Sequence, residues 1–260
     1  MTNCIEIRGL VKQYKSFTLG PIDLKVPGGS IMGLIGENGA GKTTLIKSML
    51  GIVKPTAGTA VLLGADPDRA KEDIGMVLDD CFFSEYLRVR DVETVLCRVF
   101  KTWDKGLYRD YLDKFGLSGA KNIKELSRGM RMKLSLAAAL AHRPRLLLLD
   151  EATAGLDPVV RDEILDEFLA FVSDDDHAIL ISSHITSDLE KVADYIAYLH
   201  QGKLLLCDEK DRLLESYGRL VCAREELEQV DRGYVVAARK SQYSTEALIR
   251  RRGDFKRLYP

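Results

Sequence analysis

The sequence lacks several features that would place a protein in a specialised class. Its five cysteines among 260 residues are scattered, without the close pairs that metal sites and redox motifs need. An odd, unclustered set is typical of reduced thiols in a cytosolic protein. The formal net charge is −1, so no excess of positive charge favours a nucleic-acid partner. We therefore expect a cytosolic protein that binds no nucleic acid.

Long apolar runs are lacking as well. No run approaches the ~20 residues that cross a bilayer, and the first six residues lack the charged and apolar regions of a signal peptide. Internal repeats and low-complexity segments are also missing. With 30% charged and 46% hydrophobic residues, the composition is that of a soluble globular protein. A length of 260 residues is enough for one large domain or two small ones.

A glycine-rich segment at residues 36–43 fits the pattern G-x-x-x-x-G-K-[ST]. The apolar run 31–35 before it predicts a buried strand, and residues 44–50 have the apolar spacing of a helix. Glycines let backbone N–H groups turn inward around phosphate oxygens, and a helix N-terminus adds free donors. We predict a nucleoside triphosphate site in which Lys42 reaches the β- and γ-phosphates and Thr43 ligates Mg²⁺. Its predicted binding residues are Gly36, Glu37, Asn38, Gly39, Ala40, Gly41, Lys42, Thr43 and Thr44.

The remaining pattern predicts an α/β protein. Residues 3–35 alternate apolar and polar side chains, which favours an antiparallel β-region, and residues 59–63 form another strand bounded by glycines. The uniformly apolar runs 146–149 and 178–181 are typical of central parallel strands that are covered on both faces. Residues 195–207 predict a hairpin around a Gln-Gly turn.

Residues 85–125 change character and predict a helical insert. Two stripes in it have helical apolar spacing, and we interpret both as facing the core, although periodicity cannot separate core from contact surface. The two stripes are Val92, Val95, Leu96 and Val99, then Leu107, Tyr111, Leu112 and Phe115.

The segment 213–260, after a main domain at 1–212, is more charged and less periodic, and we expect a small C-terminal extension there.

An apolar strand that ends in Asp150-Glu151 is the second chemical feature. An acid at the end of a strand near a phosphate loop is the usual way to hold Mg²⁺, and a Glu after it can polarise the attacking water. Alone, the pair could be a strand end capped by solvated acids. Because a phosphate loop lies upstream, we predict that Asp150 is a metal ligand and Glu151 a catalytic residue.

Three further segments follow in a fixed order: Leu-Ser-Arg-Gly-Met at 126–130, Ala-Thr-Ala-Gly-Leu-Asp-Pro at 152–158 and Ser-Ser-His at 182–184. The ordered set, within residues 3–212, resembles the ATP-binding subunit of an ABC transporter. The resemblance implies a P-loop NTPase core with a mostly parallel central sheet, an N-terminal antiparallel β-subdomain and a helical insert. It also implies ATP hydrolysis with Mg²⁺.

The resemblance implies roles for single residues. Ser127 and Gly129 match the signature loop, which binds the γ-phosphate of an ATP held by a second subunit. Asp157 matches a loop that contacts the opposite subunit. His184 stands where the family has a catalytic histidine that contacts the γ-phosphate, whereas a lone His at a strand end is otherwise usually structural.

One aromatic position has two candidates. Tyr14 sits where the family stacks a ring on adenine, and such stacking would hold ATP without reading the base strictly. Phe17 is the competing candidate, and a tyrosine on the face of a strand is the structural alternative for Tyr14.

Two positions depart from the family pattern. Asp79 stands where the family usually has a glutamine that assists Mg²⁺, and its carboxylate could itself ligate the metal or belong to a solvated pair with Asp80. Arg128 replaces a glycine of the signature loop, where it could contribute a positive charge. Both departures resemble a subset of exporter-type ATPases that act on antibiotics and other hydrophobic compounds.

The resemblance implies partners as well. These are a separate multi-span membrane subunit and a second ATPase chain, either identical or closely related, with the protein on the cytoplasmic face of the cell membrane. An ABC ATPase that acts on DNA or ribosomes is the alternative, but the long coiled coil, zinc cysteines or paired cassettes of such proteins are not visible. A metabolic P-loop kinase would leave residues 126–130 unexplained.

Overall fold

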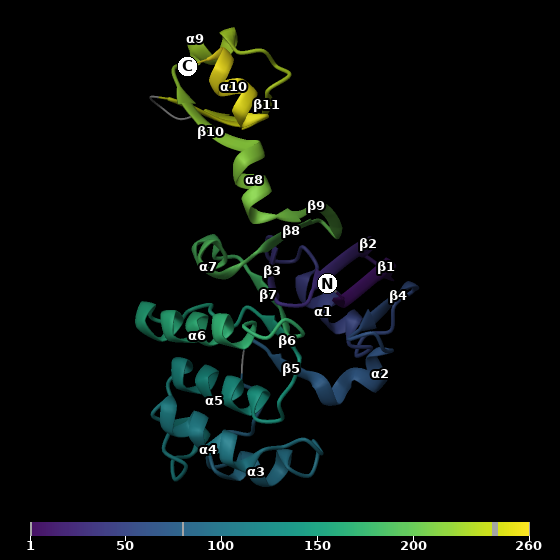
Figure 1. Cartoon of the computed structure of the whole chain (residues 1–260), viewed down its shortest axis with the longest axis vertical. Coiled ribbons are helices and arrows are strands. Elements are labelled where there is room, and N and C mark those ends of the chain that lie inside the picture. Colours follow the sequence, from purple (N-terminus) through teal and green to yellow (C-terminus); the bar gives the residue numbers. More distant parts are fainter. Residues whose placement is uncertain (1, 80, 241–243, 260) are drawn as a thin grey trace. The chain divides into compact units, whose positions relative to one another are not determined.

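The structure, a computed structural model, describes residues 2–79, 81–240 and 244–259. The chain folds into two compact units, Met1–Cys207 and Asp208–Pro260 (Figure 1). Among those residues, the first unit contains two sheets and the second contains one. Within the described residues, no helix combines the length and apolar character needed to cross a membrane.

The first unit is organised around a six-stranded sheet with the strand order β5-β6-β7-β3-β8-β9. The pairs from β5 to β8 are parallel, which confirms the predicted parallel sheet. Gln201 and Gly202, both with positive φ, join β8 to β9 as the predicted hairpin. The strands are β3 (Ser30–Ile35), β5 (Ile74–Val77), β6 (Leu146–Asp150), β7 (Ala178–Ser183), β8 (Tyr195–His200) and β9 (Lys203–Glu209).

Strands β6 and β7 are buried along their whole length because both faces of the sheet are covered. Leu147 and Leu149 point into one core and Leu146 and Leu148 into the other, as the alternation of side chains along a strand requires. One core lies under the helices that Figure 1 shows beside the central strands, and the other lies under α1 and the antiparallel sheet. The helices are α1 (Lys42–Met49), α5 (Arg128–Leu140), α6 (Pro158–Phe171) and α7 (Thr186–Val192).

The predicted antiparallel β-region is confirmed as a three-stranded sheet with the order β2-β1-β4. Its apolar side chains Ile5, Ile7 and Leu10 are buried against the second core, while the alternating polar residues face outward. A short helix, α2, follows it. The bounds are β1 (Asn3–Gln13), β2 (Thr18–Pro27), β4 (Ala57–Leu62) and α2 (Pro67–Ala70).

The insert is helical as predicted, with α3 (Asp91–Leu96) and α4 (Lys105–Lys114) packed against α5. The first predicted stripe is wrong in part. Val92 and Leu96 are buried, but the side chains of Val95 and Val99 are 46% and 59% exposed. Helix α3 ends at Leu96, so the spacing of a longer helix does not carry over to Val99.

The second stripe is confirmed at its C-terminal end. Leu112 and Phe115 are buried, Leu107 and Tyr111 are half-buried, and Tyr108 joins them as the most deeply buried aromatic of α4. The Tyr108 hydroxyl donates to the Val89 carbonyl at 2.8 Å, and burial raises its pKa well above the usual range.

The second unit contains an antiparallel sheet with the order β10-β12-β11. Its core consists of Val230, Ala247, Ile249 and Phe255, to which α10 contributes one side chain. The bounds are α8 (Lys210–Ser216), β10 (Tyr217–Cys222), α9 (Arg224–Gln229), β11 (Val235–Lys240), β12 (Thr245–Arg250) and α10 (Arg252–Leu258).

Candidate nucleotide site

The glycine-rich loop connects β3 to α1 along a path that only glycine permits. Gly39 and Gly41 have φ values of 82° and 109°, in the left-handed region that other residues rarely adopt. A Cβ atom on Gly36 would lie 2.5 Å from the carbonyl oxygen of Leu199. The glycines of the motif are therefore required by the backbone.

Lys42 is the buried charged residue of this loop, with a side chain that is only 6% exposed. Its ammonium donates to the Gly36 carbonyl at 2.7 Å and, more weakly, to the Glu37 carbonyl at 3.4 Å. The Glu151 Oε1 atom lies 3.1 Å from Nζ, close enough for an ion pair but not aligned for a hydrogen bond. A buried ammonium with incomplete hydrogen bonding is suited to an anion such as a phosphate.

Asp150 connects three elements at the carboxyl edge of the sheet. The Thr43 hydroxyl, at the start of α1, donates to Oδ2 at 2.6 Å. The Ser182 hydroxyl, on β7, donates to Oδ1 at 2.5 Å. Ser182 is fully buried and was not predicted, although it is a polar residue in register with Asp150 across two parallel strands.

Glu151 and His184, the two residues predicted to be catalytic, lie together. The His184 Nδ1 atom is 2.7 Å from Oε2 of Glu151, in the geometry of a hydrogen bond donated by an Nδ1–H tautomer. The Glu151 backbone has a φ of 54° and donates its N–H to the Ser182 carbonyl at 3.0 Å. A left-handed non-glycine residue costs about 1–2 kcal/mol, and such strain concentrates at functional sites.

The two candidates for the adenine position differ in exposure. Tyr14, just after β1, is 43% exposed, and the Lys12 ammonium lies 5.3 Å from its ring centroid. Phe17 is half-buried, with its ring 3.0 Å from where a Cβ of Gly41 would be. Phe17 therefore packs against Gly41 of the phosphate loop, and Tyr14 is the more exposed of the two rings.

The predicted metal ligands do not form a cage by themselves. Thr43 and Asp150 are hydrogen-bonded, whereas Asp79 is an exposed residue after β5, and Asp80 lies outside the described residues. In the described part of the chain, no three His, Cys, Asp or Glu side chains gather closely enough to hold a metal ion. The hydroxyl and carboxylate fit Mg²⁺ as oxygen donors that would need phosphate oxygens and water to complete its shell.

The remaining predicted residues begin helices elsewhere in the first unit. Ser127 precedes α5 and its hydroxyl accepts from the Met130 N–H at 3.3 Å, while Asp157 precedes α6 and accepts from the Val160 N–H at 3.1 Å. Both side chains are exposed. Among the described residues, no hydrogen bond or ion pair joins Ser127, Gly129 or Asp157 to the 36–43 loop.

Arg128 makes a contact that was not predicted. A Cβ atom on Gly155 would lie 3.1 Å from Cζ and Nη1 of Arg128, so the guanidinium lies directly over this glycine. Gly155 also has a φ of 68°. Arg128, which replaces the usual glycine of the signature loop, thus packs over Gly155, a residue without a side chain two positions before Asp157.

The glycine loop, Lys42, Asp150 and Glu151 at the carboxyl edge of a parallel sheet define an ATPase of the P-loop class. The ABC transporter family model matches residues 19–154, more than half of the chain. The chain belongs to the ABC transporter family, and it is an ATP-binding, ATP-hydrolysing member.

Related proteins agree with this assignment. The chain is 34% identical to the bacitracin transport ATP-binding protein BcrA of Bacillus licheniformis, over 79% of this chain and 69% of BcrA. It is 33% identical to the lantibiotic transport ATP-binding protein SrtF of Streptococcus pyogenes, over 80% of this chain and 91% of SrtF. It is also 33% identical to the daunorubicin/doxorubicin resistance ATP-binding protein DrrA of Streptomyces peucetius, over 84% of this chain and 68% of DrrA.

The fold is shared with solved structures. An ATP-binding subunit of an ABC transporter superposes with a TM-score of 0.73 at 24% identity, over 81% of this chain and 91% of that one. The protein cbiO1 of Clostridium perfringens, described as part of the ABC transporter complex cbiONQ, gives 0.70 at 23% identity, over 82% and 91%. These likenesses confirm the predicted fold class.

Ser182→Ala is expected to lower the rate of ATP hydrolysis about tenfold. The variant leaves a buried oxygen of Asp150 without its hydrogen-bond donor, which costs about 1–3 kcal/mol of free energy and displaces the carboxylate. The matched control is Ser183→Ala, since Ser183 is equally buried but bonds only to the backbone around Ile185. Both variants are assayed over a range of Mg²⁺ concentrations. If Ser182→Ala and Ser183→Ala show the same rate of hydrolysis and the same Mg²⁺ dependence, Ser182 does not position Asp150.

Proposed function

We propose that the chain is the ATPase subunit of an exporter in which two ATPase chains enclose two Mg²⁺-ATP and a separate multi-span membrane subunit carries the substrate. One observation carries this proposal. The loop, Lys42, Asp150, Glu151 and His184 are joined in one network, while the exposed Ser127 loop has no bond to it within the described chain. A second chain that supplied Ser127 and Gly129 would complete the site.

The reaction follows from this arrangement. Thr43 and Asp150 would hold Mg²⁺, which would neutralise charge at the phosphates, and Lys42 adds a buried positive charge beside them. Glu151 accepts a proton from the attacking water, and His184 orients the Glu151 carboxylate. Asp79 is a further oxygen donor on the loop after β5.

The second chain contributes through the N-terminus of its α5. This helix has thirteen residues, and its positive dipole end at Ser127 and Gly129 favours a γ-phosphate. Asp157 at the start of α6 contacts the opposite subunit. Tyr14 stacks on adenine, because its ring is the accessible one of the two aromatic candidates.

Arg128 takes part in the same interface. Its guanidinium lies over Gly155, between the Ser127 loop and the segment that leads to Asp157. A cation at this position strengthens the attraction for the phosphate of the partner's ATP, and this compensates for the glycine that the loop lacks.

The membrane subunit is expected to dock on an apolar groove of about 410 Å³ between α3, α5 and β5. Three side chains of its lining, Ile52, Phe82 and Val99, are 58–59% exposed. Phe82 follows Asp79, the candidate metal ligand, by three residues in the sequence. The occupant that we propose is a short helix of the membrane subunit with an apolar face.

Export is inferred from the relatives, whose names refer to bacitracin transport, lantibiotic transport and daunorubicin/doxorubicin resistance. The same names favour transport over a role on DNA or ribosomes. Because the chain would bind a membrane partner and hydrolyse the ATP of the cytoplasm, we expect it at the cytoplasmic face of the cell membrane.

Glu151→Gln tests the proposed chemistry. The amide cannot accept the proton of the attacking water, so hydrolysis is expected to fall by about 10²- to 10⁴-fold. The variant would then accumulate as a stable dimer with ATP and Mg²⁺ bound, and the dimer is measured by light scattering after size-exclusion chromatography. Glu163→Gln on α6 is the control, because Glu163 pairs with Lys133 away from this site. Normal hydrolysis in the Glu151 variant would remove Glu151 from this role.

Arg128→Ala is expected to raise the ATP concentration for half-maximal hydrolysis about tenfold, since a charge-assisted bond to a phosphate is lost. Arg131→Ala is the matched control on the same helix, where the guanidinium pairs with Glu85 at 3.3 Å. If both variants respond to ATP like the unmodified chain, Arg128 makes no contact with nucleotide.

Val99→Asp tests the docking groove, because a charge buried against an apolar helix costs several kcal/mol. Membrane recruitment by the co-expressed membrane subunit is expected to be lost, while the ATPase activity of the isolated chain is kept. Val95→Asp is the control, because Val95 is also exposed but does not line the groove. Equal recruitment of both variants, measured by membrane sedimentation, would place the contact elsewhere.

A further inference from the structure

The second unit contains a cavity that the ATPase chemistry does not use. It has a volume of about 640 Å³ and lies between α8, β10, β12 and α10. All of its lining residues belong to the segment 208–260, so the cavity is formed within this unit alone. Its size is within the range of about 300–1,000 Å³ that is typical of small-molecule sites.

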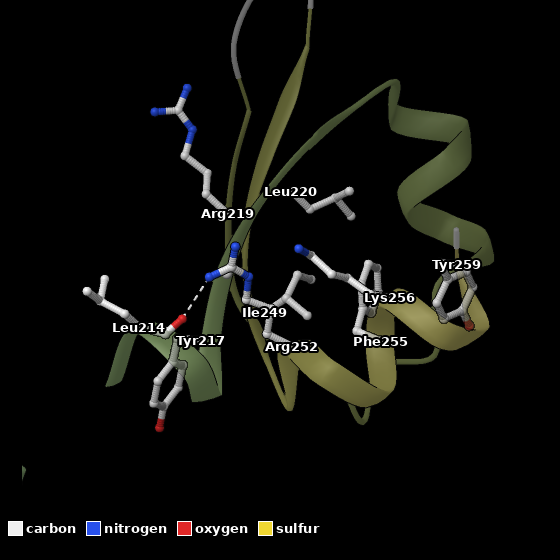
Figure 2. Close-up of a pocket in the computed structure, with 10 residues that line it drawn as sticks. Leu214, Tyr217, Arg219, Leu220, Ile249, Arg252, Phe255, Lys256 and Tyr259 are labelled. Atoms are coloured by element: carbon white, nitrogen blue, oxygen red, sulfur yellow. Dashed lines mark hydrogen bonds between the residues drawn. The ribbon is translucent and has the colours of Figure 1, made fainter. Parts of the chain in front are cut away.

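The lining combines apolar walls with positive charge, as Figure 2 shows. Three of the ten lining residues are cations, Arg219, Arg252 and Lys256, and none is an aspartate or glutamate. The other lining residues are Leu214, Tyr217, Gly218, Leu220, Ile249, Phe255 and Tyr259. This composition favours a ligand with an apolar body and an anionic head group.

Arg252 is held in place before any ligand arrives. Its Nη1 donates to the Leu214 carbonyl at 2.8 Å, drawn as a dashed line in Figure 2. The aliphatic part of the side chain crosses Gly218, where a Cβ atom would lie 3.3 Å from Cγ and Cδ. The guanidinium is therefore pre-organised and keeps other N–H groups for an anion.

Lys256 supplies a second charge. It forms no hydrogen bond or ion pair with another described residue, and Figure 2 shows its ammonium extending toward the part of the cavity that Arg252 reaches. Arg219, in contrast, pairs with Glu246 at 3.3 Å. Two cations are thus available to one anionic group.

The apolar wall is equally fixed. Phe255 and Tyr259, one turn apart on and just after α10, stack with ring centroids 4.7 Å apart. The Tyr259 hydroxyl accepts a hydrogen bond from the Asp231 N–H at 3.1 Å. Ile249, buried at the centre of the sheet, completes this side.

We propose that this cavity binds an amphipathic organic anion, with its carboxylate or phosphate on Arg252 and Lys256 and its apolar body against Ile249, Phe255 and Tyr259. The ligand is either a free small molecule or the acidic head and first acyl carbons of a membrane lipid. The proposal is independent of the nucleotide site, because no residue is shared.

The test uses the full chain and its Lys256→Met variant. Octanoate is the soluble probe, octylammonium is the probe with the same body and opposite charge, and vesicles of phosphatidylglycerol or phosphatidylcholine are the lipid probes. Arg257→Met is the matched control, because it removes the neighbouring charge of α10 at an exposed position that does not line the cavity. Binding is measured by calorimetry for the small probes and by flotation for vesicles.

Octanoate is expected to bind the unmodified chain and Arg257→Met alike, and Lys256→Met at least about tenfold more weakly. Binding only to phosphatidylglycerol vesicles, again dependent on Lys256, would support the same site with a lipid ligand. The proposal is overturned if neither anionic probe binds, if octylammonium binds as well as octanoate, or if the two variants bind equally. ATP hydrolysis in Lys256→Met should stay unchanged, because the nucleotide site shares no residue with the cavity.

Discussion

The site depends on the two hydrogen bonds that the Asp150 carboxylate accepts. One acid accepts hydrogen bonds from Thr43 and Ser182, and so joins the start of α1 to the ends of β6 and β7. The strands are parallel, so their carboxyl ends meet at one edge of the sheet. Lys42, beside Thr43, and Glu151, beside Asp150, are brought into contact by this single junction.

The junction also explains the strained backbone at Glu151. Because Asp150 is fixed by two hydroxyls and the Glu151 N–H bonds to Ser182, the chain turns sharply here with a left-handed φ. The turn directs the Glu151 carboxylate between Lys42 and His184. Preorganised groups of this kind lower the reorganisation needed when charge develops at a phosphate.

Much of the fold and of the candidate nucleotide site could be predicted from the sequence, because binding a phosphate and a metal restricts which residue types can stand at each position. The central strands were predictable because burial on both faces requires uniformly apolar runs. Ser182 was missed because a serine in an apolar strand has many explanations until its partner is known. The Arg128–Gly155 contact joins residues 27 positions apart through tertiary packing, which no local pattern encodes. The fold of 208–260 was not predicted, since its sheet is half exposed and its apolar alternation is short.

The central claim is that each ATP is shared between two chains. It is tested most directly by mixing two inactive variants, Lys42→Ala and Ser127→Arg, and measuring ATP hydrolysis. In a mixed dimer one site combines the intact Lys42 of one chain with the intact Ser127 of the other, so the account predicts that mixing restores activity that neither variant has alone. If the mixture stays as inactive as its components, the two segments act within one chain and the account is wrong.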